Sequence, residues 1–156
     1  MKKSLISFAE TLLAGVGLSV LIMLFVGQSL EIVGDSMYPT LTDGERIIAE
    51  KVSYKSREPQ SGEIIIFRSL QNQQVFLIKR VVATAGQTIQ PSEDQDLGLL
   101  ADYVNIPVPA GYLAVMGDNR PESYDSRMFG LVPLENVIGQ AFVVYWPLSA
   151  IRELGH

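Results

Sequence analysis

The segment Gly117–Arg127 carries nine polar or charged side chains in eleven positions, between two stretches that are mostly apolar. A plain surface turn needs a glycine, a proline and an asparagine, not two aspartates, two serines and two arginines. This density predicts a network of polar side chains that holds another part of the molecule in place.

Composition limits the chemistry that such a network could support. The chain has no cysteine, and its single histidine is His156, the last residue of the sequence. Thiol nucleophiles, disulfides and cysteine metal sites are therefore excluded, and a Ser-His-Asp triad or a histidine metal site has almost no support, because chain ends are usually disordered. If the chain is a hydrolase, its base must be Lys, Asp, Glu or Tyr.

Lys79 is the lysine that the pattern marks as a candidate base. Lys79 and Arg80 stand side by side in the apolar run 75–83, and neighbouring side chains on a strand point to opposite faces. Either the strand lies at an edge, with both stems along the surface, or one cation enters an apolar layer. Burial lowers the pKa of a lysine, whereas an arginine keeps its charge.

Ser36 is the corresponding candidate nucleophile. It lies between Gly34, which permits an unusual φ, and Pro39, which stiffens the exit. An ordinary turn serine fits the local pattern as well. A serine without a usable histidine needs another base, and Ser-Lys dyads are a known variant of nucleophilic hydrolysis.

Short β-rich runs must position these residues. Gly, Pro and Asn separate the runs, and no amphipathic helix longer than two turns is evident after residue 27, apart from a short candidate at Pro133–Asn136. The stretch Thr88–Ala110 is expected to be a loop. The sequence thus predicts a mainly β domain over residues 28–156, with strands at Leu30–Gly34, Glu45–Lys51, Glu63–Arg68, Val75–Ala83, Tyr112–Met116 and Val137–Tyr145.

Residues 1–27 are predicted to form a membrane anchor. Leu5–Val26 has one charged residue, Glu10, and as a helix would be roughly 33 Å long, enough to cross a bilayer. Lys2 and Lys3 place the N-terminus in the cytoplasm and the domain on the far side of the cell membrane, as a single-pass protein. A cleavable signal peptide is the alternative, but no convincing cleavage site follows.

Charge argues against nucleic-acid binding. Two of the 12 basic and one of the 17 acidic residues precede residue 28, so the domain has 10 basic and 16 acidic side chains. Such a domain is poorly suited to neutralising phosphates. The acidic stretch Glu93–Asp96 lacks the glycine and distal glutamate of an EF-hand, so no metal and no cofactor is expected.

Together these residues resemble bacterial type I signal peptidases, the membrane-bound Ser-Lys endopeptidases. Four segments carry the resemblance in the family's order, and it continues through Gly130–Pro133 and Ile138–Ala141. The four are Gly34-Asp35-Ser36-Met37-Tyr38-Pro39-Thr40-Leu41, Gly62-Glu63-Ile64-Ile65-Ile66-Phe67, Lys79-Arg80-Val81-Val82 and Gly117-Asp118-Asn119-Arg120 with Ser123 and Asp125-Ser126-Arg127.

The resemblance implies a multi-sheet β domain that cleaves signal peptides from exported preproteins after small-x-small sites, through an acyl-enzyme and as a monomer. Ser36 would be the nucleophile, and its backbone N–H would serve the oxyanion hole. Lys79 would be the general base. Some relatives place a serine where this chain has Gly34, so a second donor must come from elsewhere.

Further residues receive supporting roles from the same resemblance. Ser123 would orient the lysine amine. An ion pair between Asp125 and Arg127, together with Asp118 and Arg80, would support the Ser123 segment. Apolar pockets for the substrate would be lined by Ile32, Met37, Leu41 and Ile78.

One block departs from the family pattern: Ala83-Thr84-Ala85-Gly86-Gln87 replaces Gly-x-Pro-Gly-Asp. Two other functions stay open. Self-cleaving repressors also use a Ser-Lys dyad, but they need an internal scissile bond and usually a DNA-binding module. A membrane-anchored β adaptor, including an inactive peptidase homologue, would use the polar cluster only as structural support.

Overall fold

The computed structural model describes residues 8, 10–19, 27–91 and 96–154. Residues 10–19 are helical. Of the helices within these ranges, none combines the length and apolarity that a membrane crossing requires. The predicted span over residues 5–26 lies partly outside the described residues.

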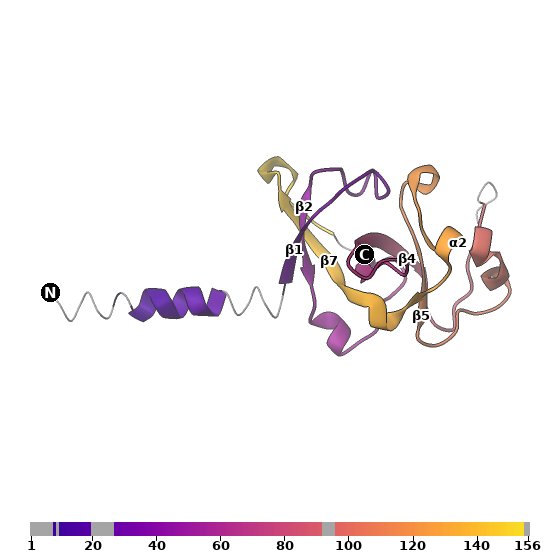
Figure 1. The fold of residues 1–156 in the computed structure, drawn as a ribbon, viewed down its shortest axis with the longest axis horizontal. Coiled ribbons are helices and arrows are strands. Elements are labelled where there is room, and N and C mark those ends of the chain that lie inside the picture. Colours follow the sequence, from indigo (N-terminus) through magenta and orange to yellow (C-terminus); the bar gives the residue numbers. More distant parts are fainter. Residues whose placement is uncertain (1–7, 9, 20–26, 92–95, 155–156) are drawn as a thin grey trace.

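The domain is mainly β, as predicted, and is built on a curled antiparallel sheet. Figure 1 shows β1, β2 and β7 on one side of the domain, β5 and α2 on the other, and β4 between them. The strands follow the order β1-β2-β7-β3-β4-β5-β6, and β8 pairs with β7. Their bounds are β1 Gly27–Glu31, β2 Arg46–Glu50, β3 Ile64–Arg68, β4 Phe76–Ala83, β5 Tyr112–Met116, β6 Val132–Pro133, β7 Val137–Trp146 and β8 Arg152–Glu153.

The strands form one continuous sheet, whereas several sheets were expected. The ten-residue strand β7 pairs with β2 along one edge and with β3 along the other. Register shifts interrupt both pairings, and such bulges increase local twist and bend a strand. Curvature within a single sheet therefore encloses the core.

Most predicted strands agree with the structure to within two residues, but the first one does not. The strand expected at Leu30–Gly34 occupies Gly27–Glu31 instead. The chain leaves the sheet at Ile32, and Gly34 has a φ of +85°, a left-handed conformation that a strand does not accommodate. The apolar run beyond residue 31 belongs to a loop.

The core surrounds β3, which is buried on both faces. Ile64 and Ile66 pack into one apolar cluster, and Ile65 and Phe67 pack into another. A strand covered on both sides reads as a continuous apolar run rather than an alternating one. β3 therefore forms the rigid centre against which β4, with Lys79, is paired.

Short helical turns complete the domain. The stretch expected to be a loop at Thr88–Ala110 contains the turn Gly98–Val104 and buries Leu100 and Val108. The polar segment, Gly117–Arg127, contains the turn Arg120–Glu122 and the start of helix α2, Ser126–Phe129. A turn at Leu134–Asn136 lies where a short helix was expected, and other turns cover Ser53–Lys55 and Leu148–Ala150.

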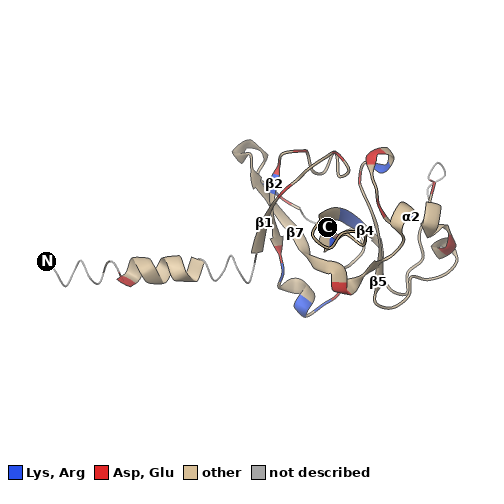
Figure 2. Cartoon of the chain, viewed as in Figure 1, with Lys and Arg blue, Asp and Glu red and all other residues tan. Residues whose placement is uncertain are grey.

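Charged residues of both signs are spread over the described part of the domain. Figure 2 shows both blue (Lys, Arg) and red (Asp, Glu) stretches scattered over the ribbon of the domain. In the described part of the chain, no group of acidic or histidine side chains is arranged to hold a metal ion.

Candidate active site

Ser36 and Lys79 meet at the edge of the core. Lys79 Nζ lies 2.7 Å from Ser36 Oγ and also donates to the carbonyl oxygen of Ile78 at 3.0 Å. The two residues are 43 positions apart. The sequence pattern left open whether a cation of β4 enters an apolar layer, and the structure buries Lys79 to 4% exposure.

Burial changes the proton affinity of the Lys79 amine. Loss of hydration lowers the pKa of Lys79 from 10.5 to about 8, partly offset by the negative charge of Asp125. A lysine with this pKa is about one-tenth neutral at pH 7, far more than a lysine with the ordinary value. Its neighbour Arg80 is held differently, by a bidentate pair with Asp118 at 2.8 and 2.6 Å.

The turn that carries Ser36 is fixed from the polar segment. The backbone N–H of Asn119 donates to the Ser36 carbonyl at 3.1 Å, and its side-chain amide donates to the Asp35 carbonyl at 3.0 Å. Thr40 Oγ1 donates to Asp118 Oδ2 at 2.5 Å. Residues after β5 thus bind the turn at its start, Asp35 and Ser36, and at its end, Thr40. This is the network, expected from the sequence, that holds another part of the molecule in place.

Asp125 is the centre of this network. It is fully buried and receives two hydrogen bonds from the Arg127 guanidinium, at 2.8 and 2.9 Å, and one from the Gly117 N–H at 3.0 Å. Burial alone would raise the pKa of Asp125, but the hydrogen bonds from Arg127, Gly117 and Ser123 outweigh it and lower the pKa. Asp125 therefore stays a carboxylate.

Ser123 lies within the network, but its geometry differs from the predicted one. Its Oγ accepts from the Gly117 N–H at 3.2 Å. Its hydroxyl also donates a hydrogen bond to Asp125, which helps to lower the pKa of that carboxyl. Within the described residues, the structure has no hydrogen bond between Ser123 and Lys79. Gly117 is essential to this packing, because a Cβ there would overlap the Ser36 carbonyl oxygen and the Ser123 side chain.

A cleft of about 170 Å³ opens beside the two residues. Ile32 and Ile78, both predicted to line a substrate pocket, lie on its wall, and Ile47 and Ile66 extend its apolar lining. Met37 and Leu41, predicted for the same role, are fully buried in the adjoining core instead. The turn directs their side chains inward, away from the cleft.

Gly34 lies near Ser36, as expected. Its N–H donates to Asp43 Oδ1 at 2.7 Å, so this group is already engaged. The Ser36 N–H has no acceptor within the described part of the chain.

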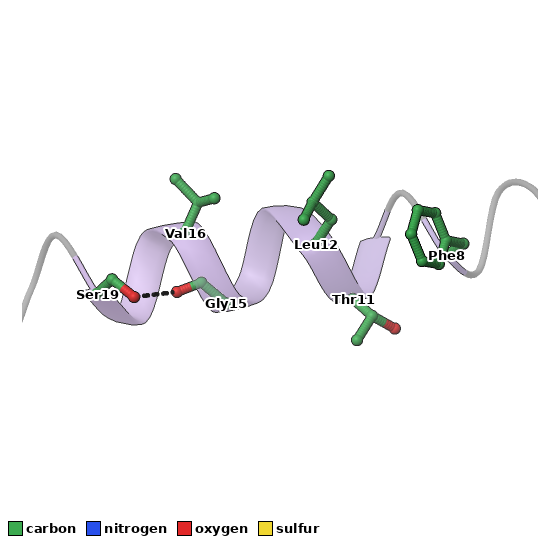
Figure 3. Close-up of a pocket in the computed structure, with 6 residues that line it drawn as sticks. All are labelled: Phe8, Thr11, Leu12, Gly15, Val16 and Ser19. Atoms are coloured by element: carbon green, nitrogen blue, oxygen red, sulfur yellow. Dashed lines mark hydrogen bonds between the residues drawn. The ribbon is translucent and has the colours of Figure 1, made fainter.

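A second hollow, of about 380 Å³, runs along the N-terminal helical segment. Figure 3 shows its six lining residues, all from residues 8–19, with Ser19 Oγ bonded to the Gly15 carbonyl at 2.9 Å. None of the six carries an ionisable side chain, and none belongs to the cleft beside Ser36.

The sequence pattern assigned no role to Asn119, Gly117 or Thr40. Gly117 and Asn119 stand in the Gly-Asp-Asn string that carried the resemblance, so their position there could have indicated a role in the site. Thr40 follows the turn proline and could have been considered as a partner of the polar segment.

Comparisons with known proteins place the sequence in a family. The chain matches the family described as "Signal peptidase, peptidase S26" over residues 5–97 and 92–146. A signal peptidase I of Leptolyngbya laminosa is 39% identical over 164 residues, 90% of this chain and 81% of that protein. A probable signal peptidase I-1 of Synechocystis is 38% identical over 92% of this chain and 84% of its own length.

Among solved structures, a crystal structure of a signal peptidase I from Enterococcus faecalis matches at 27% sequence identity. The match has a TM-score of 0.43 and covers 54% of this chain and 97% of that one.

Proposed function

This chain belongs to the signal peptidase S26 family and is a peptidase, and we propose that it removes N-terminal signal peptides from exported preproteins by a Ser-Lys mechanism. One observation carries the mechanism: Lys79 Nζ lies 2.7 Å from Ser36 Oγ. The lysine is buried at this position, and burial lowers its pKa to about 8. General base catalysis needs a group within hydrogen-bond reach whose pKa is near the working pH.

In the acylation step, neutral Lys79 takes the proton of the Ser36 hydroxyl while Ser36 Oγ attacks the scissile carbonyl carbon. The tetrahedral oxyanion accepts from the Ser36 N–H, which is free of other partners in the described residues. Lys79, now an ammonium, protonates the leaving amine, and the mature protein departs. The signal peptide stays on Ser36 as an ester.

Deacylation reverses these proton transfers. Neutral Lys79 takes a proton from water, the hydroxide attacks the ester carbonyl, and Ser36 Oγ leaves with the proton that Lys79 returns. The signal peptide is released with a new carboxylate, and the dyad is restored. No metal or cofactor enters either step.

The cleft supports specificity for small side chains on the signal-peptide side of the bond. Its volume is about 170 Å³, and its lining includes Ile32, Ile47, Ile66 and Ile78. These isoleucines offer no partner to a charged side chain, so burying one against them would be costly, and the small volume of the cleft disfavours large side chains.

Residues 5–26 are proposed to anchor the enzyme as a single-pass protein, with a cytoplasmic N-terminus and the domain over residues 28–156 outside. Support comes from the apolar sequence and from the exposed Phe8, Leu12 and Leu13 on the described helical segment. Extraction of membranes at alkaline pH should leave the full chain in the pellet, and its release into the supernatant would contradict the anchor.

The decisive experiment uses the full chain in detergent and a preprotein with an Ala-x-Ala site. Wild type should release a product whose N-terminus follows the second alanine, while Ser36→Ala and Lys79→Ala should produce none. Ser56→Ala and Lys55→Ala, both at exposed positions, are matched controls that should keep wild-type rates. Full activity in either dyad variant would disprove the mechanism, and an inactive wild type would favour an adaptor role.

A further inference from the structure

Arg152, near the C-terminus, contacts the loop that carries Ser36. It lies in the two-residue strand β8, which pairs with β7. Its Nη2 donates to the Thr40 carbonyl at 2.6 Å and to Glu45 Oε2 at 2.7 Å, and its Nη1 donates to Glu45 Oε1 at 2.8 Å. Thr40 and Arg152 are 112 positions apart, and no sequence pattern indicated the contact.

Glu45 closes the base of this loop. Its carbonyl accepts from the Ile32 N–H at 2.8 Å, and its carboxylate accepts from the Thr42 N–H at 3.0 Å. The side chain is buried, and the hydrogen bond from Arg152 lowers the pKa of Glu45 despite burial. Arg152 therefore neutralises the carboxylate that ties the two ends of the Ser36 loop together.

Thr40 connects this contact to the strand of Lys79. Its hydroxyl donates to Asp118, whose two carboxylate oxygens accept from Nε and Nη2 of Arg80. Arg80 directly follows Lys79 on β4. Thr40 is thus held from one side by the strand that carries the base and from the other side by Arg152.

We propose that Arg152 is a positioning residue that keeps Ser36 Oγ in reach of Lys79 by fixing the Thr40 carbonyl. This inference rests on the proposed function. A planar guanidinium can serve the Thr40 carbonyl and both Glu45 oxygens at once, whereas an ammonium cannot match this fork. A displacement of 1 Å at a reacting group can cost about 100-fold in rate.

The test compares Arg152→Lys with Arg57→Lys in the full chain. Arg57 is a close match, because its side chain has the same 36% exposure, pairs with the buried Glu63 and donates to the Glu58 carbonyl. Within the described residues, no hydrogen bond or ion pair joins Arg57 to the Ser36 loop. Both variants should lose similar thermal stability, so kcat and KM are measured well below either melting temperature.

Arg152→Lys should lower kcat by about tenfold or more and leave KM within about twofold, because substrate binding is retained while alignment is lost. Arg57→Lys should keep the wild-type kcat. Equal kcat values for Arg152→Lys and wild type would overturn the inference alone, as would an equal loss in Arg57→Lys. A wild type that cleaves no preprotein would instead overturn the proposed function, and the inference with it.

Two further variants cover the case in which Arg152→Lys does not fold. Glu45→Gln keeps an oxygen acceptor for the Thr42 N–H but removes the charged partner of Arg152. This variant should also lower kcat and leave KM within about twofold of wild type. Thr40→Val removes the bond to Asp118. In a double-mutant cycle its effect on kcat should be less than multiplicative with that of Glu45→Gln, and independent effects would contradict a shared route through Thr40.

Discussion

Asn119 and Ser36 are joined by a backbone hydrogen bond of 3.1 Å, from the Asn119 N–H to the Ser36 carbonyl. The Asn119 side chain adds a bond to the preceding carbonyl, that of Asp35. The polar segment after β5 therefore holds Ser36 through its backbone carbonyl, and within the described residues the Ser36 N–H has no acceptor. Each prediction below concerns one part of this arrangement.

Asn119→Ala should lower kcat by about three- to tenfold, because one hydrogen bond of about 1 kcal/mol that steadies the turn is lost. The second bond, from the backbone, remains, so the fold should survive. Cleavage rates at saturating preprotein measure the effect. Asn105→Ala, at an exposed loop position, is the control, and an equal loss there would remove the special role of Asn119.

The pH dependence of kcat/KM should follow the ionisation of the Lys79 amine. Since the pKa of Lys79 is lowered to about 8, the amine is mostly protonated below this pH and cannot accept the Ser36 proton. Activity should rise tenfold per pH unit below about pH 8 and level off above it. Lys79→Arg should be inactive at every pH, because a guanidinium does not deprotonate. A rate that is constant from pH 6 to 9 would rule out the neutral amine as base.

Lys79→Met should stabilise the fold at pH 6 while abolishing activity. The folded-state pKa of about 8 lies below the ordinary 10.5, so the unfolded chain binds more protons between these values. The buried ammonium therefore costs stability below pH 8, by at most about 3 kcal/mol, and this cost disappears as pH rises to 10.5. Urea unfolding at pH 6 and pH 10.5 should show a large gain at the lower pH and little at the higher one. A gain that is equal at both would contradict the burial argument.

Asp125→Asn should shift the pH profile toward acid. The negative charge of Asp125 raises the pKa of Lys79 and so opposes the effect of burial. Its removal should let Lys79 deprotonate at lower pH. The variant should also lose about 3–5 kcal/mol of stability, because Arg127 loses its buried partner.

Asp118→Asn is the matched control for this shift. It breaks the ion pair with Arg80, but its charge is not among the causes of the Lys79 shift. The cleavage rate of Asp118→Asn should fall, and the midpoint of its pH profile should stay at the wild-type value. If both variants moved the midpoint equally, the effect of Asp125 on Lys79 would not be specific.

The sequence by itself limited which residues could act as a base in hydrolysis. With no cysteine and a single histidine, it left Lys, Asp, Glu or Tyr as the candidates. Local patterns also located most of the strands, because Gly and Pro interrupt short β-branched runs and these preferences act over a few residues. The same local signals misplaced the first strand, since the apolar residues after Glu31 belong to a loop closed by the distant Glu45.

Only the tertiary structure decided how the candidates meet. Alternation on β4 required Lys79 and Arg80 to face opposite ways, but it could not say which face the rest of the chain would cover. The Ser36–Lys79 contact, the Thr40–Asp118 bond and the Arg152–Thr40 bond join residues 43, 78 and 112 positions apart. Contacts of this range depend on how a curled sheet brings its strands and loops together, and neither composition nor periodicity encodes that arrangement.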